Sequence, residues 1–289
     1  MKVLITGASG QLGHSLLRAA PSGNELHALT RAELDVSDAA AVRKVVQEFR
    51  PEVIVNAAAY TAVDKAETET DRAFAVNAYG PEYLAKAAQQ SSARLIHIST
   101  DFVFDGLKSR PYRPEDAVNP LGAYGRSKAE GDKRVRAVLG NDAVIVRTGW
   151  VYAAEGHNFV NTILRLAREK DSLAVIADQV GTPTWARSLA RLVWALVQRS
   201  EVKGIFHWSD AGVASWYDFA VAIQEEGVAT GLLKKTIPIR PITTEEYPLP
   251  ARRPAYSVLE KQATVALTGV KPDHWRVNLR AMLKELFNA

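Results

Sequence analysis

The chain has 289 residues, 47% of them hydrophobic and 24% charged, which is ordinary for a soluble globular protein and sufficient for one large or two modest domains. Its net charge of +4 is too small to argue for a nucleic-acid partner, although a slightly basic protein suits an anionic ligand. It contains no cysteine, which excludes disulfides, thiolate nucleophiles and cysteine-type zinc sites.

The sequence also argues against a membrane or a metal. Gly7 interrupts the first apolar stretch after a few residues, and no later run reaches the length of a membrane span. We therefore expect no membrane partner and a reducing, cytoplasmic setting. None of the six histidines has a metal-ligand spacing with a partner, so no metal is expected, and His97 is interpreted as a packed core residue.

The first element is a short apolar run with β-branched residues at 2–6, which predicts a buried strand. Three glycines follow at a spacing of three, Gly7, Gly10 and Gly13, and then a helical pattern of leucines. Glycine permits a tight turn and a close approach of backbone to a pyrophosphate, and the helix N-terminus offers free N–H groups. The pattern indicates a dinucleotide-binding turn, and an ordinary strand-to-helix turn is the alternative.

A second strand is predicted at 25–29, and Arg31 follows it closely. The tip of this strand lies beside the adenosine ribose in dinucleotide-binding folds, where an arginine suits a 2′-phosphate and an acid suits a free hydroxyl. Arg31 therefore favours NADP over NAD, although a solvated surface arginine is the alternative. Asp35 is a candidate acceptor for the adenine amino group, and Ser37 or Asp38 is expected to cap a helix over 39–49.

The next units lead to polar side chains at strand ends. A strand at 53–55 runs into Asn56, three alanines at 57–59, and Tyr60-Thr61. Small residues at a strand's carboxyl end let a flat cofactor lie close to the backbone. A long helix is predicted over 68–90, and a strand over 94–99 that ends at Thr100 and Asp101. Since ligands bind at the carboxyl ends of parallel strands, the Thr100 hydroxyl is placed where a substrate carbonyl would lie.

Strands and helices alternate throughout this half, with a further helix over 124–139 and a strand over 143–148. This alternation predicts an α/β fold of the Rossmann type, a doubly wound parallel sheet with right-handed crossovers. We expect residues 1–151 to form a dinucleotide-binding domain that carries the catalytic residues.

Tyr124 and Lys128 lie four residues apart at the start of the predicted helix, so that their side chains point the same way. An ammonium beside a phenol favours the phenolate and should lower the pKa of Tyr124 from about 10 toward neutrality. A general acid for carbonyl reduction needs such tuning. A solvated helix face with a chance tyrosine and lysine is the alternative.

The C-terminal half is less regular. Helices are predicted at 158–169, 185–199, from Ser215 and at 276–286, strands at 173–176 and 204–208, and a loop at 178–184. We interpret residues 152–289 as a smaller α/β substrate-binding region, interleaved with the main sheet. Trp185, Trp194 and Trp216 lie on apolar helix faces and are expected in the core.

Arg252 and Arg253 stand between prolines and could bind a sugar-linked phosphate with a bidentate fork, the alternative being a surface turn with two solvated arginines. Asn158 and Gln179 are further candidates for contacts with substrate hydroxyls or the base.

Several of these motifs resemble those of a known family. The glycine turn, residues 56–59 (NAAA), 99–101 (STD) and the Tyr124–Lys128 pair resemble the extended short-chain dehydrogenase/reductases over essentially the whole chain. Residues 56–67, 99–105, 147–152 (RTGWVY), 178–184 (DQVGTPT) and 250–254 (PARRP) look like those of the dTDP-4-dehydrorhamnose reductases. That family reduces the 4-keto group of a dTDP-6-deoxy-hexulose to give dTDP-L-rhamnose, used in cell-surface polysaccharide.

The resemblance implies a role for each matched residue. Thr100 and Tyr124 would hold and protonate the sugar carbonyl, and Lys128 would bind the nicotinamide ribose. The implied cofactor-binding residues are Gly7, Gly10, Gln11, Leu12, Gly13, Arg31, Asp35, Val36, Ala57, Ala58, Ala59, Tyr60, Thr61, Tyr124 and Lys128. The implied substrate-binding residues are Thr100, Asp101, Trp150, Asn158, Gln179, Arg252 and Arg253. Phe102 is a departure, since many members carry tyrosine there.

The resemblance implies NADP(H) as cofactor, with NAD(H) as an alternative, and a dTDP-sugar as substrate. Two other functions stay open: another nucleotide-sugar 4-ketoreductase or epimerase, and a non-catalytic NADP-binding regulatory subunit. The sequence leaves the oligomeric state open, with a homodimer as one expectation.

Overall fold

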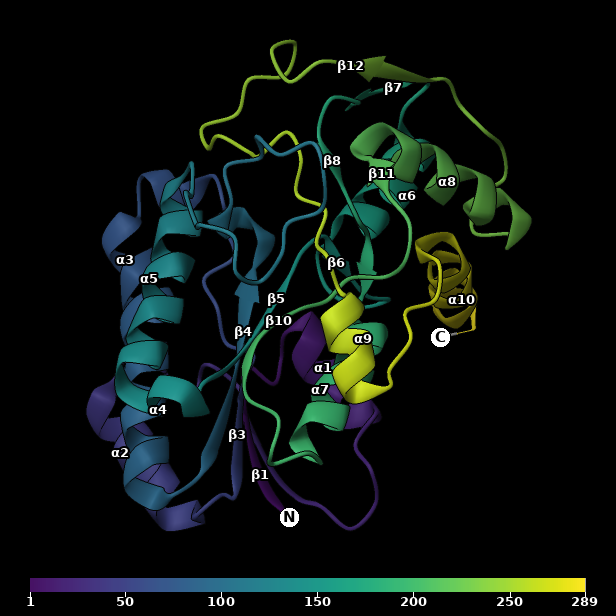
Figure 1. The fold of residues 1–289 in the computed structure, drawn as a ribbon. Coiled ribbons are helices and arrows are strands. Elements are labelled where there is room, and N and C mark those ends of the chain that lie inside the picture. Colours follow the sequence, from purple (N-terminus) through teal and green to yellow (C-terminus); the bar gives the residue numbers. More distant parts are fainter. Residues whose placement is uncertain (289) are drawn as a thin grey trace.

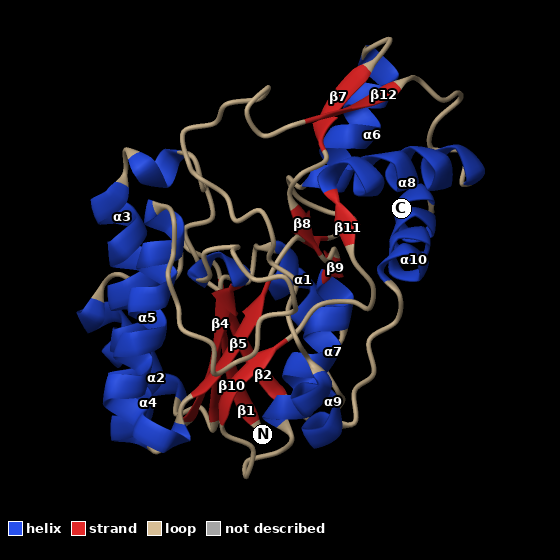
Figure 2. Ribbon diagram, turned by 45° about the horizontal axis from the view of Figure 1, so that its top comes forward, coloured by secondary structure: helices blue, strands red, loops and turns tan. Residues whose placement is uncertain are grey.

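A six-stranded parallel sheet lies at the centre of the computed structural model, which describes residues 1–288 (Figures 1 and 2). The strands are β1 (Lys2–Thr6), β2 (Glu25–Leu29), β3 (Val53–Asn56), β4 (Arg94–Thr100), β5 (Val144–Thr148), β6 (Val151–Tyr152), β7 (Leu173–Ile176), β8 (Val180–Gly181), β9 (Thr184–Trp185), β10 (Gly204–His207), β11 (Ala214–Ser215) and β12 (Ile239–Ile242). The helices are α1 (Gln11–Arg18), α2 (Ala39–Phe49), α3 (Thr70–Phe74), α4 (Gly80–Ser91), α5 (Ala123–Leu139), α6 (Phe159–Glu169), α7 (Ala186–Val197), α8 (Trp216–Ala229), α9 (Gln262–Thr268) and α10 (Trp275–Phe287).

The strand order is β10-β5-β4-β3-β1-β2, and every neighbouring pair is parallel. Helices α2, α3, α4 and α5 cover one face of the sheet, and α1, α7 and α9 cover the other (Figure 1). The chain leaves β1 toward β2 on one side and returns to β3 on the other. This reversal creates a crevice at the carboxyl ends of the strands, the usual ligand site of such sheets. The predicted doubly wound fold is confirmed.

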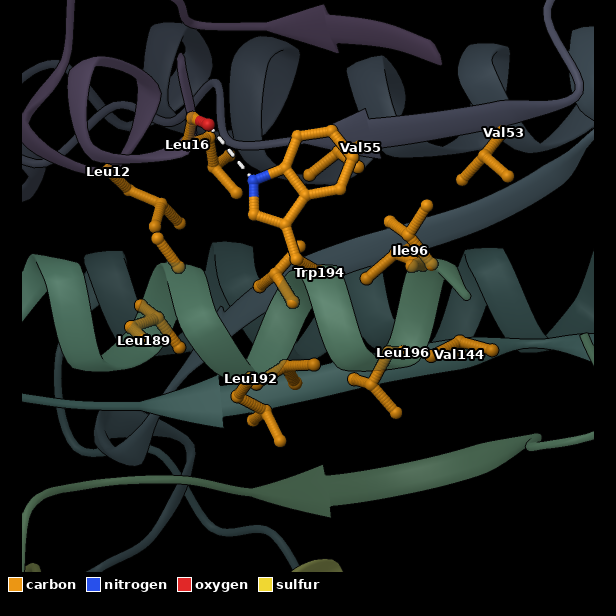
Figure 3. Close-up of a cluster of buried hydrophobic side chains, with 14 of the residues drawn as sticks. Leu12, Leu16, Val53, Val55, Ile96, Val144, Leu189, Leu192, Trp194 and Leu196 are labelled. Carbon is orange, nitrogen blue, oxygen red and sulfur yellow. Dashed lines mark hydrogen bonds between the residues drawn. The ribbon is translucent and has the colours of Figure 1, made fainter. Parts of the chain in front are cut away.

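The core between the sheet and helices α1 and α7 is made of aliphatic side chains from both halves of the chain (Figure 3). Trp194 of α7 lies among them, and its indole N–H donates to the carbonyl of Leu16 on α1 at 2.9 Å. A buried indole N–H needs such a partner. The contact fixes α7 against α1, so the second half of the chain helps to position the glycine turn.

The second half also extends the main sheet. β10 pairs with β5 at its edge, while α6, α8, α10 and the β7–β12 pair form a separate layer beyond the carboxyl ends of the strands (Figures 1 and 2). This layer has its own aromatic and aliphatic core. Among the helices of residues 1–288, none is both long and apolar enough to cross a bilayer.

Most predicted elements are confirmed within two residues, including the cap of α2, where Asp38 accepts from the N–H groups of Ala40 and Ala41. The helix predicted over 68–90 is wrong in detail, because a π-helical turn over Ala75–Tyr79 separates α3 from α4. Pro81 accounts for the widening, since it has no N–H to donate to the Asn77 carbonyl four residues earlier. β12 and α9 were not predicted.

Gly131 allows α5 to lie against this π turn. A Cβ at position 131 would stand 2.1 Å from the Asn77 carbonyl oxygen. We expect Gly131→Ala to lower the free energy of unfolding by about 1–3 kcal/mol, because overpacking outweighs the gain of roughly 1 kcal/mol that alanine brings to a helix. Chemical denaturation would measure the change, and Lys133→Ala on the exposed side of α5 should stay within about 0.5 kcal/mol of the parent. An equal or higher stability of Gly131→Ala would contradict the close packing.

Candidate active site

A cavity of about 1040 Å³ opens at the carboxyl ends of the central strands. Its walls come from the turns after β1, β2, β3, β4 and β5, from the start of α5, and from residues of the C-terminal layer. The volume lies at the upper end of the range for ligand pockets, as a site for two nucleotide-sized molecules would require.

The glycine turn forms one end of the cavity. Gly7 has a φ of 71°, and a Cβ there would stand 2.7 Å from the backbone nitrogen of Ala58, so only glycine lets the turn meet the end of β3. A Cβ on Gly13 would stand 2.3 Å from the Gly7 carbonyl oxygen. No side chain caps the N-terminus of α1, and Gly10, Gln11 and Leu12 line the cavity there. The first backbone N–H groups of the helix are thus available to an anion.

Asp35 lies between two arginines in the wall beyond the turn. Its carboxylate accepts from the Ser37 N–H at 3.0 Å and the Ser37 hydroxyl at 2.6 Å. These hydrogen bonds, and to a lesser extent the charges of Arg31 and Arg72, lower the pKa of Asp35. Arg31 lies 3.7 Å from the carboxylate and Arg72 stacks over Tyr60 at 5.7 Å. This end of the cavity can therefore attract an anion while Asp35 stays an ionised acceptor.

Asn77 fixes the loop after β3, which begins with three alanines. The Asn77 side chain accepts from the Tyr60 N–H at 2.8 Å and donates to the Tyr60 carbonyl at 3.0 Å, and it also donates to the Ser127 hydroxyl at 3.0 Å. These bonds join the loop after β3 to α5. They fix the backbone of Ala57 to Thr61 as one wall of the cavity.

Thr100, Tyr124 and Lys128 line the same cavity. Thr100 is the last residue of β4, and its hydroxyl accepts from the Phe102 N–H at 3.2 Å and donates to Asp101 at 3.1 Å. Lys128 is fully buried and donates to the Ile98 carbonyl at 2.7 Å. An ammonium has three donors, so this contact leaves two for other partners. The predicted set of hydroxyl, phenol and ammonium is thus brought to one cavity.

The expected lowering of the Tyr124 pKa is wrong for this structure. Burial raises the pKa of Tyr124 to about 12, the nearby Thr100 hydroxyl opposes this, and the carboxylates of Asp101 and Asp132 add to it. Burial also lowers the pKa of Lys128 to about 8. The Lys128 ammonium donates to the Ile98 carbonyl, and burial sets the direction of the Tyr124 shift. Tyr124 therefore keeps its proton at neutral pH, as a proton donor must.

Asp101 and Trp150 form the wall toward the C-terminal layer. Burial raises the pKa of Asp101 to about 6. Gly149 is required beside it, because a Cβ there would stand 2.4 Å from the carboxyl group. Trp150 has a φ of 52° and stacks on Trp216 at 3.5 Å. A bulky residue in the left-handed region is strained, and such strain is typical of functional sites.

Trp216 differs from its prediction. It was expected in the core, but it is only partly buried and lines the cavity, where it stacks on Trp150 and contacts Phe159 at 4.6 Å. The core positions of Trp185, Trp194 and His97 are confirmed. The aromatic wall of Trp150, Phe159 and Trp216 offers flat apolar faces to a planar ring or a sugar.

Four candidates lie outside the cavity lining: Gly13, Asn158, Gln179 and Arg252. Asn158 caps α6 and donates to the side chain of Gln11 at 3.0 Å, and Gln179 donates to Thr244 at 3.0 Å. Arg252 is exposed. The substrate roles of these three polar residues stay predictions. Asn158 is linked to the cavity by its hydrogen bond to Gln11, which lines it.

Arg253 does line the cavity, but Asp64 holds its guanidinium. Two hydrogen bonds join them, at 2.8 and 3.1 Å, and Arg253 also donates to the Ala251 carbonyl. The pair ties the segment after β12 to the loop after β3. An incoming phosphate would have to share Arg253 with a carboxylate.

The residues fit a bound dinucleotide. The hydroxyls of Ser99 and Thr148 are buried, line the cavity and have no hydrogen-bond partner in the protein. Buried polar atoms without partners are rare and call for a ligand or water. Together with the uncapped start of α1 and the two free donors of Lys128, they offer polar partners to a ligand in the cavity.

Several lining residues were missed by the sequence analysis: Ser9, Lys65, Arg72, Ile98, Ser99, His157, Phe159 and Trp216. Arg72 and Phe159 lie on helices that carry no motif, so only the packing brings them to the site. Ser99 could have been found, because it directly precedes Thr100 at the end of β4. Among residues 1–288, no three histidine or acidic side chains are grouped to hold a metal ion.

Comparison with known proteins gives full-length matches. The model of the family described as RmlD substrate binding domain matches residues 1–288. The spore coat polysaccharide biosynthesis protein SpsK of Bacillus subtilis (strain 168) is 43% identical, over 100% of this chain and 99% of the relative. The dTDP-4-dehydrorhamnose reductase of Escherichia coli (strain K12) is 42% identical, over 99% and 98%. A crystal structure of the Bacillus anthracis dTDP-4-dehydrorhamnose reductase in complex with NADP is 36% identical, covers 98% and 99% of the two chains, and has a TM-score of 0.91.

Proposed function

This chain belongs to the RmlD family, together with the dTDP-4-dehydrorhamnose reductases, and we propose from this premise that it reduces the 4-keto group of dTDP-4-dehydrorhamnose to give dTDP-L-rhamnose. The observation that carries the proposal is the meeting of Thr100, Tyr124 and Lys128 in one cavity with the glycine turn. A proton donor at a strand end beside a dinucleotide-sized site suits a carbonyl reduction.

Bound NADPH would supply the hydride for C4 of the sugar. Tyr124 gives its phenolic proton to the C4 oxygen as negative charge develops there. The Thr100 hydroxyl, which donates to Asp101 in the structure, would turn to donate to the same oxygen and spread that charge, as donors of an oxyanion site do. Lys128 adds a positive charge beside the phenol at the moment when a phenolate forms. The buried positions of Thr100 and Lys128 keep this geometry ready before the substrate binds.

The rest of the cavity suits the cofactor and a nucleotide-sugar. The first N–H groups of α1 suit the cofactor's pyrophosphate, and Arg31 suits its 2′-phosphate. The stack of Trp150 and Trp216 gives a flat surface for the base or sugar, and Asp101 is an acceptor for a sugar hydroxyl. The product would serve cell-surface polysaccharide. Because the reaction consumes NADPH and a nucleotide-linked sugar, the cytoplasm remains the expected setting, and the homodimer stays a prediction.

The test is the loss of NADPH absorbance when the purified protein is mixed with dTDP-4-dehydrorhamnose. We expect one NADPH to be consumed for each dTDP-L-rhamnose formed, whereas an epimerase would convert sugar without net consumption. A protein that binds NADPH but consumes none with this sugar would contradict the proposal and favour a regulatory subunit. Parallel assays with UDP- and GDP-linked keto sugars would show whether the nucleotide matters.

Arg31→Ala should weaken NADPH binding by about tenfold and leave NADH binding nearly unchanged. An exposed arginine–phosphate contact contributes roughly 1–2 kcal/mol. The variant removes the arginine that binds the 2′-phosphate, a group that NADPH has and NADH lacks. Fluorescence titration of both cofactors measures the two dissociation constants. Arg43→Ala on the exposed face of α2 serves as the control, and an equal loss for NADPH and NADH would show that Arg31 does not contact the 2′-phosphate.

A further inference from the structure

Two buried polar atoms face each other without hydrogen bonds behind the active site. His97 Nε2, on β4, and Asp132 Oδ1, on α5, lie 3.8 Å apart. Neither atom has a hydrogen-bond partner in the protein, and both residues are at least 96% buried. The separation is too long for a direct hydrogen bond, and each unsatisfied atom is costly in such a place. A water molecule between them would satisfy both, since buried water bridges polar groups of this kind.

Asp132 lies one helical turn after Lys128, on the same face of α5. The charge of Asp132 raises the pKa of Lys128 against the effect of burial, and the charge of Lys128 contributes to keeping the pKa of His97 well below its usual value. Lys128 and Asp132 are therefore neighbours on one face of α5, and Asp132 in turn faces His97. Lys128 also lines the main cavity.

Asp132 also lines a second cavity, of about 750 Å³, on the other side of α5. The rim of this cavity includes the exposed residues Val118, Arg126, Lys133 and Arg136, so it meets solvent. Its inner wall is Asp132 together with Arg147, whose Nε donates to Asp132 Oδ2 at 3.1 Å. Arg147 thus holds one carboxylate oxygen, and the other, Oδ1, faces His97 without a hydrogen-bond partner in the protein.

We propose that Asp132, with a water held between it and His97, relays protons from the second cavity to Lys128 and so reloads Tyr124 after each turnover. The proposal rests on the reductase function, which uses one solvent proton in each cycle. It assigns Asp132 a part in the reaction without contact to the substrate. Tyr124 can then regain its phenolic proton without a water molecule in the main cavity.

Each proton transfer in the relay balances. A phenolate left on Tyr124 takes a proton from the Lys128 ammonium, and the neutral amine takes one from the bridging water. The water takes one from the Asp132 carboxyl group, which had gained it from solvent in the second cavity. Every group returns to its starting state, and no electron is transferred.

The charged groups around the relay define its pH dependence. Those facing it are Tyr124 and Lys128 of α5, Asp101 after β4, His97 of β4, Arg147 of β5, and Arg126, Glu130, Lys133 and Arg136 at the second cavity. Lys128 must be protonated to reload Tyr124, so kcat should fall as the pH rises through about 8. Because Asp132 raises the pKa of Lys128, its removal should move this fall to lower pH.

The test is the pH profile of kcat for Asp132→Asn, which keeps the shape of the side chain and an oxygen for Arg147. We expect kcat to drop by about tenfold at pH 8, a smaller loss than the 10²–10⁴-fold effect of a direct acid–base group. The fall of kcat at alkaline pH should move to lower pH. The dissociation constant of NADPH should stay unchanged. Formate should restore part of the activity of Asp132→Ala through the second cavity. Asp142→Asn, an exposed acid paired with Lys203, is the matched control.

A structural readout is independent of turnover. A high-resolution crystal structure of the parent should show an ordered water within hydrogen-bond distance of His97 Nε2 and Asp132 Oδ1. If the parent is active and Asp132→Asn has the same pH profile of kcat, the relay is overturned. A loss of kcat that does not depend on pH, and that formate does not restore in Asp132→Ala, would overturn it too. A parent that consumes no NADPH with the keto sugar would instead overturn the proposed function. The crystal structure would still show whether a water lies between His97 and Asp132.

Discussion

Replacing Tyr124 by phenylalanine is expected to lower kcat by about a hundredfold or more, because a positioned general acid contributes 10²–10⁴. The Tyr124 phenol interacts with the Thr100 hydroxyl, and its raised pKa of about 12 keeps it protonated across the neutral range. Phenylalanine keeps the ring that meets Phe102 edge to face at 5.6 Å, so the packing is preserved. Steady-state kinetics with NADPH and the keto sugar measure the loss.

Binding should separate this effect from a damaged fold. The dissociation constant of NADPH should change by less than about twofold in Tyr124→Phe, since the variant removes one hydroxyl from the substrate end of the cavity. Tyr79→Phe, at an exposed tyrosine outside the cavity, is the matched control. Near-normal turnover of Tyr124→Phe would sink the assignment of Tyr124 as the proton donor.

The parts of the site that depend on strand ends could be predicted from the sequence. Gly7 and Ala57 each follow a strand of the parallel sheet and Thr100 ends one, and parallel strands end at the same edge. Once the alternation of strands and helices was recognised, their meeting in one cavity followed from topology. The resemblance then supplied roles that spacing alone left open, because a tyrosine and a lysine four residues apart are common on any helix.

Other parts depend on packing that the sequence does not display. Trp216 follows the same helical pattern as a core tryptophan, and only the left-handed turn at Trp150 brings the two rings together in the cavity. The direction of the Tyr124 pKa shift also required the structure. Burial raises the pKa, the Thr100 hydroxyl opposes this, and the four-residue spacing of Tyr124 and Lys128 displays neither. The partners of Asp132 come from three separate elements, so no local motif marks them.

Replacing Lys128 by methionine is expected to lower kcat/KM by about a hundredfold or more and to weaken NADPH binding by about tenfold. The variant removes a positive charge from the cavity lining and the N–H donors that the Ile98 carbonyl leaves free, so both proton donation and cofactor binding should suffer. Fluorescence titration and steady-state kinetics measure the two effects. Lys44→Met on the exposed face of α2 is the control.

Stability should change in the opposite direction to activity in Lys128→Met. The pKa of Lys128 is lower in the folded protein than in the unfolded chain, so the unfolded state binds more protons between pH 8 and 10.5, and the stability of the parent rises with pH in that window. Below pH 8 the buried ammonium carries its full desolvation cost, which methionine of similar length does not have. Denaturation at pH 7 should therefore show Lys128→Met at least as stable as the parent. A large loss of stability at this pH would mean that Lys128 holds the fold, and its loss of activity could not then be assigned to chemistry.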